Sequence, residues 1–373
     1  MCVLSVATLN SGKDWVDQYP NQIKFISLLN RDEQLLRTTL LPTNDTPIIS
    51  AIDVLHHGTS NGLNQSTGLY VALTNYYSND NTTHIHHDPT IQYTSRGILV
   101  NTLLDMSIDE FRRMTLHHQL QFNCNITGFN IFMCNLFDHT PIVLFITNRP
   151  NSAHVQSTSN TIYKLHLPTD TPSNNDDVSD TSNSPHHIAY IQQLSSVDDI
   201  HQLYTIHGIS NGYLNDQRYP RIHKLQHKLS DILQESIGQC SNTTIDTLIN
   251  HIVHHSSAAL NDMSYDKQQL SNVCDNPDCL SSQSGDIVLL NNAREVDALK
   301  LSTQLIYIPS NTVLHHHHHH PNNSPPVDMN TVWATRSQTI IIATTSTIYY
   351  YYRTTVNYPL PDPWITYQIP IPP

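Results

Sequence analysis

Cys2 is the residue whose position most directly suggests chemistry, because it follows the initiator methionine and begins the apolar run "CVLSVATL". If Met1 is removed, Cys2 carries a free α-amine beside its thiol, and the ordinary pKa values of these two groups differ by less than about one unit. The amine can then take the proton of its own thiol, as an N-terminal amine does for a threonine nucleophile. The alternative is that Cys2 is a small buried hydrophobe, the common role of a free cysteine.

The motif "NRDE" at residues 30–33 places charged groups at the end of a second apolar run, "IKFISLLN". A guanidinium near a thiol favours the thiolate, which is the role that we assign to Arg31. Asp32 can orient the ammonium form of the Cys2 amine. Because neighbours on a strand point to opposite faces, only one of the two faces Cys2 unless a bulge intervenes, and Arg31 is the better candidate. The alternative is that the motif is a polar turn.

Apolar periodicity predicts the elements that must position these residues. Residues 2–9 and 23–30 are expected to form a hairpin that brings Cys2 near Asn30 and the residues after it. Further strands are predicted at residues 68–77, 128–137, 141–149, 304–310 and 337–352, and helices at residues 95–106, 107–120, 219–237 and 244–255. Ser107 stands three residues before Glu110, which is the spacing of a capping box. Strands, then helices, then strands favour an α+β fold of layered sheets covered by helices.

Three polar stretches interrupt these elements, at about residues 150–187, 267–285 and 310–330. They consist of turn-forming and polar residues and include the uninterrupted histidine run at residues 315–320. Such composition cannot build a packed core, so we expect disordered inserts within one domain that spans residues 1–373.

Composition excludes several classes of protein. The net charge is −13 and only 13% of residues are charged, so no basic face is expected for nucleic acid or anionic membranes. No apolar run reaches the ~18 residues of a transmembrane helix, and the N-terminus lacks the pattern of a secretory signal. The six cysteines contain no C-x-x-C pair, which indicates reduced thiols in a cytosol-facing compartment.

The 25 histidines raise the question of a metal centre. His84 and His86 alternate on a predicted strand, and His251, His254 and His255 can share one helix face. Histidine also enriches the polar inserts, so composition explains most of these residues and we expect no metal site. Cys274 and Cys279 lie in an insert with the wrong spacing for a zinc knuckle, and we interpret them as incidental.

Short motifs along the chain, taken in order, resemble those of the NRDE family, also called the transport and Golgi organisation 2 family. The resemblance covers nearly the whole chain outside the inserts, and "GTSNGLN" at residues 58–64 is similar to the family's Gly-Thr-Trp-x-Gly loop with Ser60 in place of tryptophan. Six of the ten glycines lie in or beside these motifs, which indicates that the shape of the backbone there requires glycine. The motifs are Cys2, "NRDE" (30–33), "ALTNYY" (72–77), "SRG" (95–97), "GFN" (128–130), "ITNR" (146–149), "GISN" (208–211) and "ATRSQT" (334–339).

The family resembles N-terminal-nucleophile hydrolases, which implies a four-layer α-β-β-α sandwich and a site around Cys2, Arg31 and Asp32. Asn75 and Asn211, each at the end of a β-like run, can supply amide donors to an oxyanion, or can simply close turns. The choloylglycine-hydrolase type of site separates its arginine and aspartate by two residues, whereas Arg31 and Asp32 are adjacent. For Arg336 we favour a cross-sheet ion pair over a catalytic role.

Two functions follow from this resemblance. The first is a protein of Golgi organisation and protein secretion, and of intracellular haem or lipid handling, in which the hydrolase-like fold serves as a binding body. It implies a cytoplasmic location with association to Golgi or mitochondria, no required cofactor, and haem as a carried ligand. The alternative is an active N-terminal-cysteine amidohydrolase or thioesterase that acts on a small acyl substrate.

Overall fold

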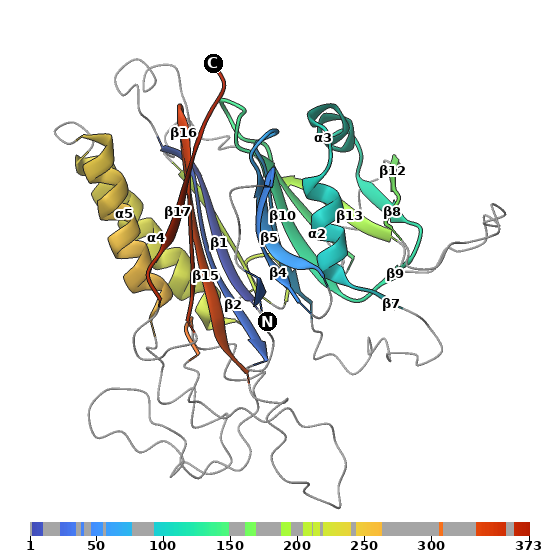
Figure 1. Cartoon of the computed structure of the whole chain (residues 1–373), viewed down its shortest axis with the longest axis horizontal. Helices are drawn as coiled ribbons and strands as arrows, with labels where there is room; N and C mark the ends of the chain where they lie inside the picture. Colours follow the sequence, from blue (N-terminus) through green and yellow to red (C-terminus); the bar gives the residue numbers. More distant parts are fainter. Residues whose placement is uncertain are drawn as a thin grey trace, which may run out of the picture.

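The computed structural model has a mixed α+β fold that consists mostly of two β-sheets, which confirms the predicted fold class at this level (Figure 1). It describes residues 2–9, 23–34, 39–40, 46–54, 57–76, 93–148, 161–168, 188–194, 204–210, 212–216, 219–239, 244–262, 306–308, 333–355 and 362–373.

The first sheet has six antiparallel strands in the order β14-β1-β2-β15-β16-β17. The predicted hairpin of β1 and β2 lies in its middle, and β15 and β16 form the second predicted hairpin. The strands are β14 (Tyr204–Ile209), β1 (Cys2–Leu9), β2 (Ile23–Gln34), β15 (Trp333–Thr344), β16 (Thr347–Thr354) and β17 (Ile365–Pro370).

The second sheet has nine strands in the order β12-β8-β13-β11-β10-β6-β5-β4-β3. Its strands are β12 (Ile162–Leu165), β8 (Gln119–Phe122), β13 (Ile188–Leu194), β11 (Val143–Thr147), β10 (Phe129–Asn135), β6 (Leu69–Asn75), β5 (Thr59–Asn64), β4 (Ile48–Asp53) and β3 (Thr39–Leu40). A short parallel pair, β7 (Tyr93–Thr94) and β9 (Asn125–Ile126), completes the strands described.

The main core lies between the two sheets, where alternate residues of each strand meet. The tyrosine run of β16 illustrates the alternation. Tyr350 and Tyr352 face the inter-sheet core, whereas Tyr349 and Tyr351 face the helices on the other side of the sheet. Both faces of this sheet are therefore apolar, which explains the nearly continuous hydrophobic runs in the sequence.

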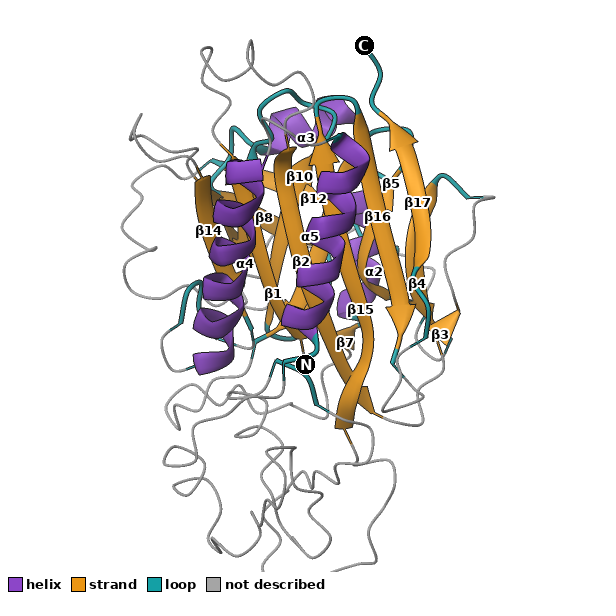
Figure 2. Cartoon of the chain, turned by 90° about the vertical axis from the view of Figure 1, so that its left-hand side faces the viewer, coloured by secondary structure: helices purple, strands orange, loops and turns teal. Residues whose placement is uncertain are grey.

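Helices cover the outer face of each sheet. Figure 2 shows α4 (Pro220–Gln239) and α5 (Ile245–Leu260) side by side along the six-stranded sheet, with a shared apolar core beneath them. The shorter α2 (Arg96–Leu104) and α3 (Ile108–Met114) pack on the nine-stranded sheet. The predicted capping box is confirmed, because Ser107 and Glu110 bond each other's backbone at the start of α3.

Two glycines from separate motifs allow one of these helices to approach its sheet closely. A Cβ atom placed on Gly97 of α2 would lie 2.6 Å from the Cα of Gly58, and one on Gly58 would lie 2.6 Å from the Cα of Gly97. Both obstacles are backbone atoms, which no side-chain rotation can move. The motifs "SRG" and "GTSNGLN" are thus linked by packing, since only glycine fits at either position.

Several elements differ from the sequence prediction. The segment predicted as a loop after residue 58 forms buried strand β5, β12 lies within the first predicted insert, and β17 lies in the proline-rich tail. Residues 306–308 do not form a strand, so the prediction of a strand at residues 304–310 is wrong for these three residues. The described residues include 161–168 of the first predicted insert, but not its residues 150–160 and 169–187, the other two inserts with the histidine run, or His84 and His86.

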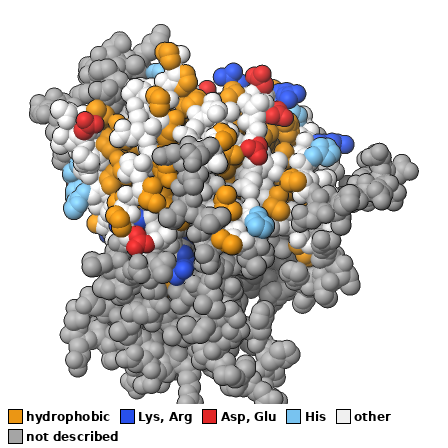
Figure 3. Space-filling view, in the orientation of Figure 1, with side chains coloured by type: hydrophobic (Ala, Val, Ile, Leu, Met, Phe, Trp, Pro, Cys, Tyr) orange, Lys and Arg blue, Asp and Glu red, His pale blue; other side chains and the backbone are white. Residues whose placement is uncertain are grey.

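On the face seen in Figure 3, described side chains are mainly hydrophobic or uncharged, and the acidic and basic side chains are interspersed. Among the described helices, none combines the length and apolar character needed to cross a membrane.

Candidate functional site

Cys2 begins β1; the residue is 5% exposed and belongs to the core between the two sheets. The register of β1 and β2 places Cys2 directly opposite Arg31. Directly opposite residues of an antiparallel pair lie on the same face of a sheet. The structure thus agrees with the expectation that Arg31, rather than Asp32, shares the face of Cys2.

Arg31 connects the two sheets at this end of the core. One of its guanidinium nitrogens lies 3.8 Å from Oδ2 of Asp53, the last residue of β4 in the nine-stranded sheet. Both side chains are almost fully buried. Because water screens such a pair only weakly, the ion pair restrains the guanidinium within the inter-sheet space next to Cys2.

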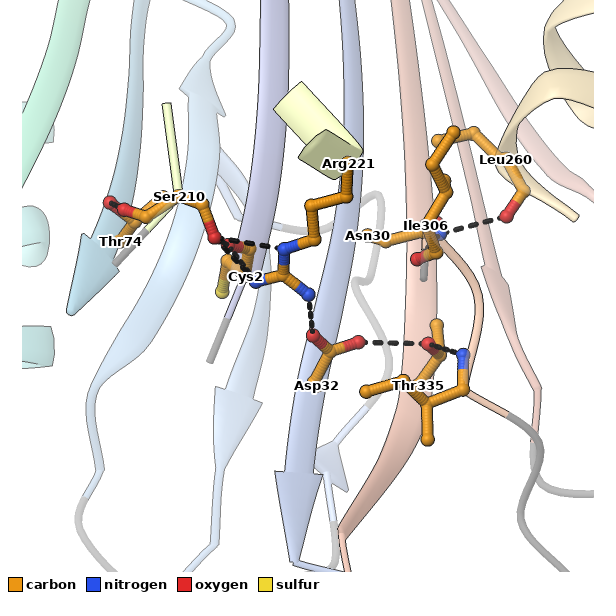
Figure 4. A network of polar contacts seen from close by, with 10 residues as sticks. Cys2, Asn30, Asp32, Thr74, Ser210, Arg221, Leu260, Ile306 and Thr335 are labelled. Carbon is orange, nitrogen blue, oxygen red and sulfur yellow. Dashed lines mark hydrogen bonds and ion pairs between the residues drawn. The ribbon is translucent and has the colours of Figure 1, made fainter. Parts of the chain in front are cut away.

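Asp32 points to the opposite face of β2, toward helix α4. Its Oδ2 lies 2.8 Å from the Nη1 atom of Arg221, and both side chains are completely buried. Its Oδ1 accepts a hydrogen bond of 2.8 Å from the Thr335 hydroxyl (Figure 4). A buried carboxylate needs such partners to remain charged, and Asp32 has one on each oxygen.

A bulge in β15 makes the arrangement around Asp32 possible. Thr335 lies opposite Asp32 and Ser337 lies opposite Arg31, so Arg336 is the additional residue between them. A bulge of this kind reverses the side-chain alternation along one strand. Thr335 consequently reaches the helix-covered face, while Ser337 remains opposite Arg31.

Arg221 also holds the main chain of Cys2. Its Nη2 donates a hydrogen bond of 2.8 Å to the carbonyl oxygen of Cys2, and the Ser210 hydroxyl donates another of 2.9 Å to the same oxygen (Figure 4). The ladder between β1 and β14 ends at the pair Leu4 and Ile209. Side chains therefore replace the sheet as donors to this carbonyl group and hold the first residue of β1.

The segment after β14 is held by two neighbours in the other sheet. The Thr74 hydroxyl donates a hydrogen bond of 2.6 Å to the carbonyl oxygen of Ser210, and Asn130 Nδ2 donates one of 2.8 Å to that of Gly212. Thr74 and Asn130 lie directly opposite each other in β6 and β10. The nine-stranded sheet thus fixes the chain on both sides of position 211.

The predicted oxyanion donors are only partly described. Asn75 is the last residue of β6, as expected, and is half-buried. Asn211 lies outside the described residues, although its neighbours Ser210 and Gly212 are held as above. Their amide roles remain predictions.

Asn30 of the same motif supports the fold. Its Nδ2 donates hydrogen bonds of 2.8 Å to the carbonyl oxygens of Leu260, at the end of α5, and Ile306. The first of these bonds satisfies the carbonyl group of Leu260, which the end of the helix leaves without a hydrogen-bond donor. Asn30 therefore joins α5 to β2, whereas Arg31 faces the other sheet.

The other described thiols lie in environments that suppress reactivity. Burial is the main cause that raises the pKa of the Cys134 thiol far above its usual range, and burial also raises the pKa of Cys124. A raised pKa lowers the fraction of reactive thiolate. Neither residue therefore competes with Cys2 as a candidate nucleophile.

Sequence reasoning missed Ser210, Arg221 and Thr335 as parts of this network. Ser210 and Thr335 lie inside quoted motifs, but only the fold shows that they contact Cys2 and Asp32. Arg221 did leave a signal, because it occupies the first turn of α4, where the helix dipole disfavours a cation. The structure shows what compensates this cation, namely the buried carboxylate of Asp32.

Comparison with known proteins agrees with the motif analysis. The sequence model described as Transport and Golgi organisation 2 matches residues 1–357. The chain belongs to this family. No curated protein matches this chain. Among solved structures, it is similar to a Caenorhabditis elegans N-acylethanolamine-hydrolyzing acid amidase ortholog, with 12% identity over 67% of this chain and 85% of that one, and a TM-score of 0.36.

Proposed function

We propose that this Transport and Golgi organisation 2 family member is an N-terminal-cysteine hydrolase that cleaves small amides or acyl thioesters. The observation that carries the proposal is that buried side chains fix the main chain of Cys2. Buried Arg221 and Ser210 fix its carbonyl group on one side of β1, while its side chain shares the other face with Arg31. An N-terminal nucleophile needs this restraint, because the first residue of a chain is otherwise among the most mobile.

The order of layers supports the same class of fold. The layers follow one another in the order α4 with α5, six-stranded sheet, nine-stranded sheet, and α2 with α3. This order supports the proposal of a four-layer α-β-β-α sandwich of the N-terminal-nucleophile hydrolase type. In that class the nucleophile begins a central strand, and β1 is a central strand here.

The proposed reaction begins after Met1 is removed. The Cys2 amine takes the thiol proton, and the thiolate attacks the substrate carbonyl carbon to form a tetrahedral oxyanion. Amide groups of Asn75 and Asn211 are the proposed donors to this oxyanion. The ammonium group then returns the proton to the leaving amine or thiol, and an acyl thioester remains on Cys2. Water, deprotonated by the same amine, hydrolyses this thioester and restores the free thiol.

The decisive experiment compares two forms of the chain that differ only at the N-terminus. One form has a free Cys2 amine, and the other carries one glycine before Cys2, so that the thiol is kept but its own amine is lost. Both are incubated with short-chain acyl amides and acyl thioesters, and intact mass spectrometry detects acylation. We expect acylation and turnover only in the free-amine form and none in Cys2→Ala. Equal turnover of the free-amine form and Cys2→Ala contradicts the proposal, as does the absence of acylation.

A second candidate function is carriage of haem or another apolar ligand in transport and Golgi organisation, within the cytoplasm or at Golgi or mitochondrial surfaces. The residue that favours it is His207 of β14. Among the described residues, neither of its buried ring nitrogens has a hydrogen-bond partner, and burial lowers its pKa, which favours the neutral imidazole. A neutral imidazole with an unused nitrogen suits an axial haem ligand.

A haem titration followed by optical absorbance tests this second function. Specific carriage predicts saturation at or below roughly micromolar haem, which corresponds to about 8 kcal/mol of binding free energy. His207→Ala should weaken the spectral change, whereas His118→Ala, at an exposed histidine between α3 and β8, should not. Identical titrations of both variants would assign the absorbance change to other histidines.

A further inference from the structure

Helices α4 and α5 bring together three metal-ligating side chains on the outer layer of the molecule. Glu235 lies on α4, and His251 and His255 lie one turn apart on α5. One ligand atom of each residue lies within 4.8 Å of those of the other two. The two helices pack side by side, as Figure 2 shows, so the group bridges elements rather than belonging to a single helix.

The group has the features of a site rather than of a chance cluster. The Nε2 atom of His251 is buried and has no hydrogen-bond partner among the described residues, although Oε2 of Glu235 lies 3.7 Å away. An unpaired buried imidazole nitrogen normally costs free energy. The rings of His251 and His255 lie 4.2 Å apart between centroids, so both present nitrogens to the same region.

We propose that Glu235, His251 and His255 bind a divalent transition metal of the zinc class. Two imidazoles and one carboxylate form a donor set that Zn²⁺ uses, and it leaves a fourth position for water. Imidazole favours Zn²⁺ and its neighbours over Mg²⁺ or Ca²⁺, which prefer oxygen ligands. Metal–ligand distances of about 2.0–2.2 Å require the three atoms to move closer together, and the exposed Glu235 side chain can rotate to do so.

The structure separates the three histidines of α5. His254 is exposed and is not part of this three-residue group, although its spacing also fits the helix face of His251 and His255. The carboxylate on the neighbouring helix takes its place, and no sequence pattern on α5 could indicate it. A bound metal would join α5 to α4, the helix that carries Arg221.

The test is a Zn²⁺ titration by calorimetry and a Co²⁺ titration by visible absorbance, which reports coordination geometry. Both use the full chain with His315→Ser through His320→Ser, because an uninterrupted histidine run binds such metals by itself. We expect one equivalent of metal and the absorbance of four- or five-coordinate Co²⁺. We also expect a melting temperature that rises with Zn²⁺ concentration and saturates, since a ligand of the folded state stabilises it.

Matched substitutions distinguish this site from general histidine binding. His255→Gln and Glu235→Gln should each weaken Zn²⁺ binding by at least about tenfold. The controls His254→Gln and Asp231→Asn, on exposed neighbours of the same two helices, should leave it unchanged. Melting temperatures without metal show whether each variant is folded. Equal affinity for His255→Gln and His254→Gln, or no saturable binding to the parent chain, overturns the proposal.

Discussion

The guanidinium of Arg221 lies 2.8 Å from the carbonyl oxygen of Cys2, with a second nitrogen 2.8 Å from the Asp32 carboxylate. One buried side chain of α4 thus joins the first residue of β1 to the "NRDE" motif at the end of β2. Asp32 therefore acts on the main chain of Cys2 through Arg221, whereas Arg31 occupies the face of the Cys2 side chain. The adjacency of Arg31 and Asp32 is explained by this division between the two faces of the sheet.

The first prediction concerns this buried ion pair. Arg221→Met should lower the free energy of unfolding by roughly 3–5 kcal/mol, because it leaves the Asp32 carboxylate buried without its cation. The same change removes a donor to the Cys2 carbonyl, so it should also slow acylation of Cys2. Urea denaturation measures the first effect, and the acylation rate of the folded fraction measures the second.

A double-mutant cycle separates the ion pair from simple loss of packing. The double variant Asp32→Asn with Arg221→Met should lose less stability than the sum of the two single variants, because it contains neither charge and so leaves none unpaired. Arg221→Lys should recover part of the stability, since it restores the charge, but not the geometry of a guanidinium that contacts two groups. Additive costs would show that the two side chains contribute independently.

The second prediction concerns the thiol. Under limiting iodoacetamide, peptide mapping should show Cys2 labelled before Cys134 and Cys124, whose thiol pKa values are raised by burial. Arg31→Gln should slow labelling of Cys2, because it removes the cation on the same face. The other two sites serve as internal controls, since a general loosening of the fold would increase their labelling. Unchanged labelling of Cys2 in Arg31→Gln would contradict the role assigned to this guanidinium.

All four described helices, but only seven of the seventeen described strands, could be predicted from their periodicity. The hairpins of β1 with β2 and of β15 with β16 follow from long apolar runs, and α3 follows from its capping box. Strand β5 could not be predicted in this way. Its sequence "TSNGLN" has little apolar character, yet all six residues are buried, because polar side chains find partners inside the fold. Tertiary context overrides local propensity there.

The side-chain directions within one strand of the site could be predicted from the sequence, but the contacts between different elements could not. Alternation on β2 correctly separated Arg31 from Asp32, since it depends on local geometry alone. The partner of Asp32 could not be found in this way, because Arg221 is 189 residues away in sequence. The bulge at Arg336 was equally hidden, since no glycine or proline marks it within "ATRSQT". Pairings of this kind arise only when the sheet and helix layers meet.

The third prediction tests the contact between two motifs. Gly97→Ala in a helix ordinarily increases stability by about 1 kcal/mol, because alanine has the higher helix propensity. Here the added methyl group meets the backbone of Gly58 at 2.6 Å, so we expect a loss of about 1–3 kcal/mol instead. Gly58→Ala should behave alike, and the double variant should deviate from additivity because one contact is involved. Increased stability of Gly97→Ala, measured in urea, would show that α2 can move away from β5.

The last prediction concerns Lys24, a buried lysine whose Nζ donates a hydrogen bond of 2.9 Å to the carbonyl oxygen of Asp138. Burial lowers its pKa from the ordinary value of 10.5 to about 8, although Asp138 and Cys134 partly oppose the shift. Between these two pH values the unfolded chain binds more protons at this residue than the folded chain does. The free energy of unfolding therefore rises with pH in this interval.

Lys24→Met removes this dependence together with the hydrogen bond. The stability of the variant relative to the parent should be highest below pH 8, where the parent bears the full cost of a buried charge, and should fall as pH rises toward 10.5. Urea denaturation of both chains at matched ionic strength measures this difference. Tyrosine ionisation affects both chains alike and cancels in the comparison. A difference in stability that stays constant from pH 7 to 10 would mean that Lys24 keeps an ordinary pKa in the folded protein.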